Sequence, residues 1–173
     1  MYKWLLFDAD NTLFDFDTDS ATALTKTFAF GQIEHNPETV AAYYRINKAC
    51  WDAFELGEIS AETLRAERFR RLLAELGQAG DAGELSNRYI QHLGEGTTLL
   101  PGARDLLFVL HTRFNMLLIT NGLTEVQRPR FAATNMNRFF KHTVISNEVG
   151  YAKPDPRIFD VCFEKMGRYY SGI

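Results

Sequence analysis

Two carboxylates lie two residues apart near the start of the chain, in a setting that suits chemistry. Asp8 and Asp10 follow a short apolar run that begins at Trp4, and a polar turn and the hydroxyl of Thr12 come next. A short apolar run before a polar break is typical of a buried parallel strand. Ligands of open α/β sheets bind outside the carboxyl ends of such strands. Taken alone, the two acids fit equally well a turn that they merely cap.

Two further apolar runs end in polar groups of complementary kinds. One run ends in Thr120, and the backbone amides of Asn121 and Gly122 follow it. Another leads through a loop to Lys153. Because the carboxyl ends of parallel strands share one edge of a sheet, we expect all of these groups to converge on the two carboxylates.

The combined set of groups matches what phosphoryl transfer through a covalent intermediate requires. One carboxylate can attack phosphorus, and a second carboxyl can protonate the leaving oxygen and then activate water. Donors from Thr120 and from the start of the following helix would bind phosphate oxygens, and Lys153 would offset negative charge. A phosphate dianion beside Asp8 calls for a divalent cation, and Mg²⁺ with oxygen ligands and retained waters suits this site.

The elements that must position these groups alternate between strands and helices. Apolar runs predict strands over residues 3–8, 114–120 and 143–146, with helices after the second and third. This alternation favours a doubly wound parallel sheet with right-handed crossovers. In the helix after the second strand, Thr124 and Gln127 fit a capping box. Pro129 predicts a kink or a late start of that helix.

Residues 15–93 contain four predicted helices and no predicted strand. The four are predicted to begin near Thr18 or Asp19, Asn36, Ser60 and Asp81. A helical insertion directly after a catalytic strand can act as a lid. The alternative is a helical subdomain that packs and does nothing else.

Composition excludes several classes of protein. The chain has 173 residues, 46% of them hydrophobic, and a net charge of −3, which allows one core domain with a modest appendage. Four arginines within residues 65–71 alternate with glutamates, which predicts a solvated helix face and no nucleic-acid partner. Two cysteines, Cys50 and Cys162, give no disulfide framework and indicate the cytoplasm. No apolar stretch approaches the ~20 residues of a membrane span, and no signal peptide is recognisable.

Three stretches resemble motifs of the haloacid dehalogenase (HAD) superfamily of hydrolases. They are Phe7–Leu13, Leu118–Gly122 and Ala152–Phe159. Within that superfamily the likeness is closest to pyrimidine 5′-nucleotidases. The resemblance implies an α/β fold with a HAD-like Rossmannoid parallel sheet and an α-helical cap inserted after the first strand. Its core domain would comprise residues 1–14 and 94–173, and its cap domain residues 15–93.

The resemblance also implies a role for each site residue. Asp8 would be the nucleophile and Asp10 the general acid and base, with Lys153 as the catalytic cation that orients phosphate. Thr120 and Asn121 would bind phosphate. The Asp8 carboxylate and the Asp10 main-chain carbonyl would hold Mg²⁺. An acid at position 10 favours a small phosphate ester over a haloacid, because halide leaves without a proton.

One motif of the superfamily has no counterpart after the last predicted helix. The family's fourth motif is a strand ending in Gly-Asp that completes the metal site, whereas only residues 168–173 follow that helix here. Asp15, Asp17 and Asp19 are predicted to be solvated turn residues and not substitutes. Without further strands, residues 3–8 would form a sheet edge that can pair with another chain, as in a homo-oligomer.

Two hypotheses about function therefore stay open. The first is a Mg²⁺-dependent phosphatase that hydrolyses small phosphomonoesters, with nucleoside 5′-monophosphates preferred, through an aspartyl-phosphate. The second is a truncated, catalytically impaired remnant that binds phosphate or a partner. A haloacid dehalogenase is disfavoured by Asp10, while sugar-phosphate and phosphoglycolate phosphatases remain alternatives, because caps choose substrates in this family.

Overall fold

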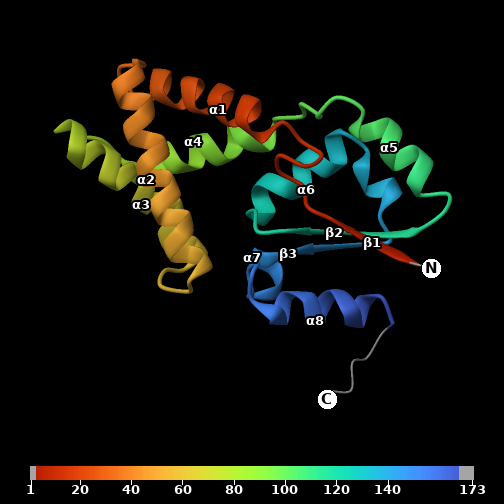
Figure 1. Ribbon diagram of the computed structural model, residues 1–173. Helices are drawn as coiled ribbons and strands as arrows, with labels where there is room; N and C mark the ends of the chain where they lie inside the picture. Colours follow the sequence, from red (N-terminus) through yellow and green to blue (C-terminus); the bar gives the residue numbers. More distant parts are fainter. Residues whose placement is uncertain (1–2, 168–173) are drawn as a thin grey trace. The chain divides into compact units, whose positions relative to one another are not determined.

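The computed structural model describes residues 3–167, and the stretch 168–173 discussed above lies outside the described residues. The chain divides into two compact units (Figure 1). The first contains the residues up to Asp19 together with those from Gly94 onward, and the second is Ser20–Leu93. The sequence predicted a core domain of residues 1–14 and 94–173 and a cap domain of residues 15–93. That the two units act as a core and a cap stays a prediction.

A parallel sheet forms the centre of the first unit. Its strands are β1 (Trp4–Phe7), β2 (Asn115–Thr120) and β3 (His142–Ile145), in the order β1-β2-β3. Phe7 lies opposite Leu118. The prediction of an α/β protein with a parallel sheet is confirmed, and the carboxyl ends of the three strands share one edge.

Helices cover both faces of this sheet (Figure 1). On one face lie α5 (Ala103–Leu110), α6 (Thr124–Ala133) and the short 3₁₀ helix η1 (Met136–Phe139). On the other lie α7 (Ser146–Val149) and α8 (Pro156–Lys165). Neither η1 nor α7 was predicted, because both are too short to show a helical period.

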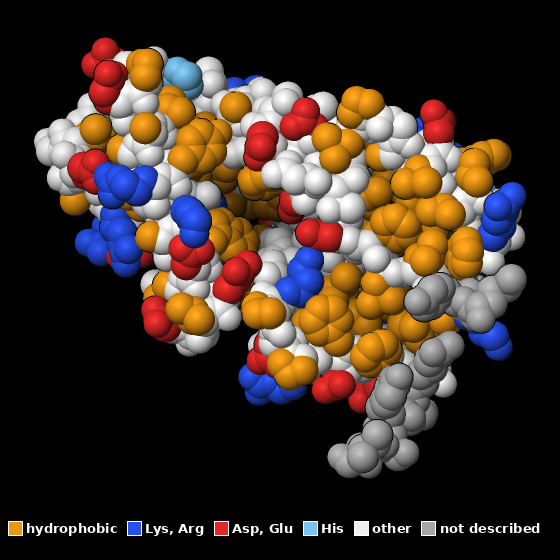
Figure 2. Space-filling model, viewed as in Figure 1, with side chains coloured by type: hydrophobic (Ala, Val, Ile, Leu, Met, Phe, Trp, Pro, Cys, Tyr) orange, Lys and Arg blue, Asp and Glu red, His pale blue; other side chains and the backbone are white. Residues whose placement is uncertain are grey.

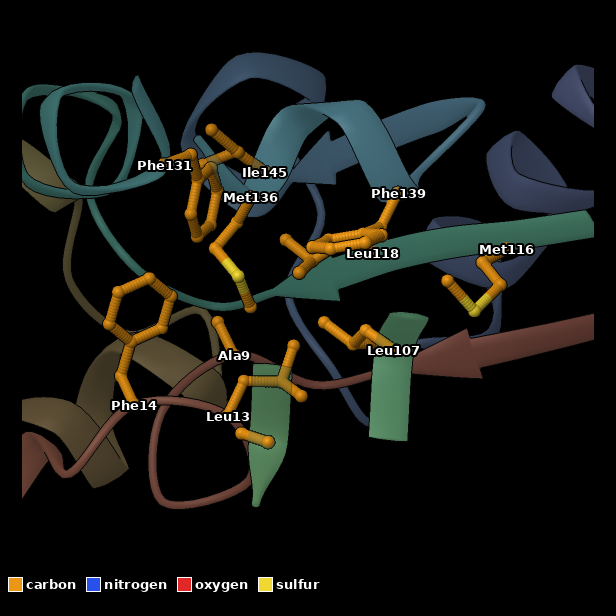
Figure 3. Packing of buried hydrophobic residues seen from close by; sticks show 11 residues of the cluster. Ala9, Leu13, Phe14, Leu107, Met116, Leu118, Phe131, Met136, Phe139 and Ile145 are labelled. Atoms are coloured by element: carbon orange, nitrogen blue, oxygen red, sulfur yellow. The ribbon is translucent and has the colours of Figure 1, made fainter. Parts of the chain in front are cut away.

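Alternate residues of β2 pack into the two faces, which explains why the strand reads as a continuous apolar run. Met116 and Leu118 join a cluster with the residues shown in Figure 3, whereas Leu117 and Ile119 face α8. Ala9 is fully buried in the first of these clusters. The segment between the two carboxylates at positions 8 and 10 is therefore anchored in the core.

In the part of the chain that the structure describes, β1 is an edge strand, as predicted. The side chain of Leu6 on this strand is 36% exposed. Further apolar side chains are exposed on α5, and Figure 2 shows hydrophobic groups gathered on the visible face of the first unit. These exposed residues of α5 are Leu106, Phe108 and Val109.

The second unit is built from four helices, as predicted. They are α1 (Phe16–Phe30), which begins in the first unit, α2 (Pro37–Glu55), α3 (Ala61–Leu76) and α4 (Ala82–Gly94), whose last residue belongs to the first unit. Asn36 and Ser60 cap α2 and α3 by accepting hydrogen bonds from backbone amides three residues ahead, at 2.8 and 3.1 Å. Buried aromatic rings fill the interior, with Tyr43 against both Phe69 and Tyr89.

Three local predictions were wrong in whole or in part. Helix α1 begins at Phe16 and not at Thr18 or Asp19, because Asp15 caps it by accepting from the Thr18 amide at 3.1 Å. Helix α6 begins at Thr124, so of the two effects predicted for Pro129 the late start is excluded, while the kink stays a prediction. The arginine-rich face of α3 is not wholly solvated, because Arg68 is only 3% exposed.

The described helices include none that is long and apolar enough to cross a membrane. Both cysteines, Cys50 and Cys162, are free and buried.

Candidate active site

The carboxylate that follows β1 and the lysine that follows β3 meet at the carboxyl edge of the sheet. The Asp8 Oδ1 atom lies 2.8 Å from Lys153 Nζ. The same oxygen accepts the backbone N–H of Ala9 at 2.8 Å. The Asp8 side chain keeps 42% of its surface exposed and is thus open to a substrate. The structure thus brings together two predicted site residues that lie 145 positions apart in the sequence (153 − 8).

The side chain of Asn121 makes two hydrogen bonds to the backbone of Lys153. Its Nδ2 donates to the Lys153 carbonyl oxygen at 2.8 Å, and its Oδ1 accepts the Lys153 N–H at 2.6 Å. The Lys153–Pro154 peptide bond is cis. Because these bonds engage the Asn121 side chain, a phosphate contact from this residue would come from its backbone N–H. The side chain itself positions the lysine.

The hydroxyl of Thr120 lies at the buried end of β2. Its Oγ1 accepts the Gly122 N–H at 3.1 Å and the Gln127 Nε2–H at 3.3 Å. A hydroxyl that accepts twice still carries its own hydrogen as a donor. Thr120 therefore retains one proton that these two bonds do not use, and its contact with a phosphate oxygen stays a prediction.

Both oxygens of the Asp10 carboxyl are hydrogen-bonded to helix α6. Oδ1 accepts from an Arg130 guanidinium nitrogen at 2.6 Å, and Oδ2 accepts from Gln127 Nε2 at 2.6 Å. Burial raises the pKa of Asp10 above its ordinary value and outweighs the opposing effect of the Arg130 guanidinium. The nearby Asp8 carboxylate raises this pKa further. A carboxyl that retains its proton more readily is better suited to act as a general acid.

The contributions of Gln127, Arg130 and Asp19 to this site were not predicted from the sequence. The predicted capping box is wrong, because the N-cap residue of α6 is Leu123, which makes no side-chain cap, and Gln127 is bonded to Asp10. Asp19 is not solvated, since it is 5% exposed and pairs with Arg130 at 3.1 Å. The spacing of three residues between Gln127 and Arg130, which places both on one helix face, was the available signal.

The magnesium ligands stay a prediction. Among residues 3–167, no group of three or more His, Cys, Asp or Glu side chains is arranged to hold a metal ion. The predicted ligands are one carboxylate, from Asp8, and one main-chain carbonyl, from Asp10. Magnesium commonly binds proteins through one or two carboxylates and completes its shell with waters and substrate phosphate. The donor set therefore fits an ion that the chain and a phosphate would hold jointly.

Comparison with known proteins identifies the family. The family model described as haloacid dehalogenase-like hydrolase matches residues 2–171. The chain is 34% identical to the HAD-hydrolase YfnB of Bacillus subtilis, over 97% of this chain and 72% of that protein. It is 35% identical to the pyrimidine 5′-nucleotidase YjjG of Escherichia coli and 36% identical to the pyrimidine 5′-nucleotidase PynA of Streptococcus pneumoniae. Those matches cover 96% and 99% of this chain, and 72% and 71% of the relatives.

Solved structures agree with this assignment. A crystal structure of YfnB bound to magnesium superposes with a TM-score of 0.88 at 34% identity, covering 98% of this chain and 75% of that one. The L-2-haloacid dehalogenase of Xanthobacter autotrophicus, at 19% identity and a TM-score of 0.73, shares the fold, over 98% of this chain and 66% of that one. The chain belongs to the haloacid dehalogenase-like hydrolases, as the three sequence stretches indicated.

Proposed function

We propose that this hydrolase is a phosphatase that cleaves small phosphomonoesters, with nucleoside 5′-monophosphates as its substrate class. The observation that carries the proposal is the 2.8 Å pair of Asp8 and Lys153 at the carboxyl edge of the sheet, which supports Asp8 as the nucleophile and Lys153 as its cation. Two relatives named pyrimidine 5′-nucleotidases, each about 35% identical over nearly the whole chain, support the substrate class.

The first chemical step would transfer the phosphoryl group to the protein. A carboxylate oxygen of Asp8 forms a bond to phosphorus, while the bond from phosphorus to the ester oxygen breaks. The electron pair of that bond stays on the leaving oxygen, which takes the proton of the Asp10 carboxyl. The Thr120 hydroxyl and the backbone N–H groups that follow it would bind the oxygens of the transferring group. The products are an alcohol and an acyl phosphate on Asp8.

The second step would return Asp8 to its starting state. The Asp10 carboxylate accepts a proton from water as the water oxygen bonds to phosphorus, and the bond from phosphorus to Asp8 breaks. Inorganic phosphate leaves, and Asp10 holds the proton needed for the next cycle. Lys153, held by Asn121, keeps a positive charge beside Asp8 in both steps.

Magnesium would be held by the Asp8 carboxylate and the Asp10 main-chain carbonyl. There it would reduce the repulsion between the Asp8 carboxylate and the negative charge of the substrate. Asp10 sets this proposal apart from haloacid dehalogenation, since a halide leaves without a proton and an alkoxide does not.

Phosphate release by the purified chain tests the proposal. The substrates are pyrimidine and purine nucleoside monophosphates and p-nitrophenyl phosphate, each with Mg²⁺ and with a chelator, and 2-chloropropionate is the dehalogenase control. We expect Mg²⁺-dependent release of phosphate, and Asp8→Asn should lower kcat about a thousandfold or more. Asp52→Asn, which alters an exposed ion pair with Lys48, should leave the rate unchanged.

Two results would contradict the proposal. One is the absence of phosphate release from every ester, which would favour the binding protein that has lost catalysis. The other is phosphate release that persists in Asp8→Asn, because a reaction through an aspartyl-phosphate needs that carboxylate. Transfer of ³²P from labelled substrate to the protein, lost in Asp8→Asn, would report the intermediate directly.

A further inference from the structure

The side chain of Arg130 is completely buried in the first unit and contacts groups that are distant in sequence. One guanidinium nitrogen donates to Asp10 Oδ1 at 2.6 Å, and the other donates to Asp19 Oδ2 at 3.1 Å. The Nε atom donates to the carbonyl oxygen of Gly96 at 3.1 Å. A single arginine therefore joins the catalytic segment to the two segments through which the chain enters and leaves residues 20–93.

The second oxygen of Asp10 is fixed by the same helix. Gln127 Nε2 donates to Asp10 Oδ2 at 2.6 Å, and it also lies 3.3 Å from Thr120 Oγ1. Because Gln127 and Arg130 lie one turn apart on α6, the helix presents two donors to the two oxygens of one carboxyl. Both the rotation and the direction of that carboxyl are thus set by α6.

Close packing leaves this network little freedom. The Arg130 guanidinium lies 4.3 Å from the centre of the Phe14 ring. A Cβ atom at Gly96 would lie 2.6 Å from Asp19 Cγ, and one at Gly122 would lie 2.7 Å from Gln127 Cγ. Real side chains do not tolerate such distances, so both glycines leave the space that Asp19 and Gln127 occupy.

We propose that Arg130 is a positioning residue, which with Gln127 holds the Asp10 carboxyl in the orientation from which it protonates the leaving oxygen. Asp19 pairs with the same guanidinium at 3.1 Å and compensates its charge. Arg130 touches neither the substrate nor the phosphorus and acts only through Asp10. This inference rests on the proposed phosphatase function and adds to it the group that orients the acid.

The dependence of the rate on the leaving group separates this role from a merely structural one. A nitrophenolate leaves readily without a proton, whereas the alkoxide of a nucleoside needs one. The value of kcat/KM reports the steps up to cleavage of the ester bond. In Arg130→Met, we expect kcat/KM to fall about a hundredfold or more for a nucleoside monophosphate and less than tenfold for p-nitrophenyl phosphate.

Matched variants complete the experiment, all assayed with Mg²⁺. Arg128→Met is the control, since Arg128 lies on the same helix but makes a half-exposed ion pair with Glu148. It should match the unmodified chain with both esters. Gln127→Leu should show the same selective loss as Arg130→Met, and Arg130→Lys should recover part of the rate with the nucleotide. Gln127→Leu supplies the decisive measurement if Arg130→Met fails to fold.

Equal losses with both esters, or no loss with the nucleotide, would overturn the positioning role. A faster reaction in Arg130→Met would also overturn it, because Arg130 would then restrain Asp10 instead of aiming it. An unmodified chain that hydrolyses neither ester would overturn the proposed function and this inference together. That result is distinct from an active chain whose leaving-group dependence Arg130 does not affect.

Discussion

Each unit buries one arginine in the described part of the chain, and the two side chains have different partners. Arg68 in the second unit lies 4.6 Å from the centre of the Tyr89 ring and donates to Asn47 Oδ1 at 3.2 Å. Within residues 3–167 it pairs with no carboxylate, and its Nε atom has no hydrogen-bond partner. Arg130 in the first unit also lies over an aromatic ring but pairs with both Asp10 and Asp19.

The difference shows what a buried charge contributes in each place. Arg68 is stabilised mainly by cation–π interactions with aromatic rings. These interactions stabilise the helical core but do not orient another polar side chain. Arg130 makes directional bonds to two carboxylates, which fix the positions of those groups as well as its own. A buried arginine therefore indicates a site only when its partners are themselves chemically active.

The largest expected effect in this comparison is that of removing Arg130. Arg130→Met leaves Asp19 buried and Asp10 partly buried without a counter-charge, and breaking a buried pair in this way costs about 3–5 kcal/mol. The free energy of unfolding, measured in urea, should fall by that amount. Adding Asp19→Asn should restore part of it, because one stranded charge is then absent. A double variant no more stable than Arg130→Met would show that the pair is not coupled.

A smaller effect is expected for Arg68. Arg68→Met removes one hydrogen bond and a cation–π contact but strands no carboxylate, so we expect a loss of about 1–2 kcal/mol. The same urea titration measures it, and kcat/KM should be unchanged with every substrate. If Arg68→Met were as costly as Arg130→Met, the distinction between the two surroundings would be lost.

The smallest effect concerns the exposed arginines beside Arg68. Hydrogen bonds from Arg70 and Arg71 lower the pKa of Glu67 from its ordinary value to about 2. A lowered pKa in the folded state contributes stability above the unfolded value of about 4.5, and this contribution is lost as the pH falls toward 2. Because the arginines are exposed, each pair contributes only about 0.3–0.5 kcal/mol.

Thermal unfolding between pH 2 and pH 6 measures this contribution. In Glu67→Gln the part of the pH dependence that comes from Glu67 should disappear, while stability near pH 2 should match that of the unmodified chain. An unchanged pH dependence would mean that the ion pairs of α3 do not contribute to folding.

Features that depend on neighbouring residues could be predicted from the sequence. The strands, the caps Asn36 and Ser60, and the meeting of Asp8 with Lys153 followed from short apolar runs, from capping residues and from the geometry of parallel sheets. Each of these signals lies within a few residues of the element that it predicts.

The missed features depend on contacts between distant parts of the chain. Gln127 is 117 residues from Asp10, and Arg130 is 111 residues from Asp19. Asp19 has the sequence context of a solvated turn, and its burial follows only once α6 supplies a partner. Gln127 matched a local capping pattern, but its side chain instead donates to Asp10 and to Thr120.

The glycine in Thr120-Asn121-Gly122 has a consequence for the Asp10 carboxyl. It is kept small by the side chain of Gln127 and not by a left-handed backbone. An alanine there would force the Gln127 side chain to move. Such a movement would break its hydrogen bonds to Asp10 and Thr120, so a substitution at position 122 would disturb Asp10 without touching it.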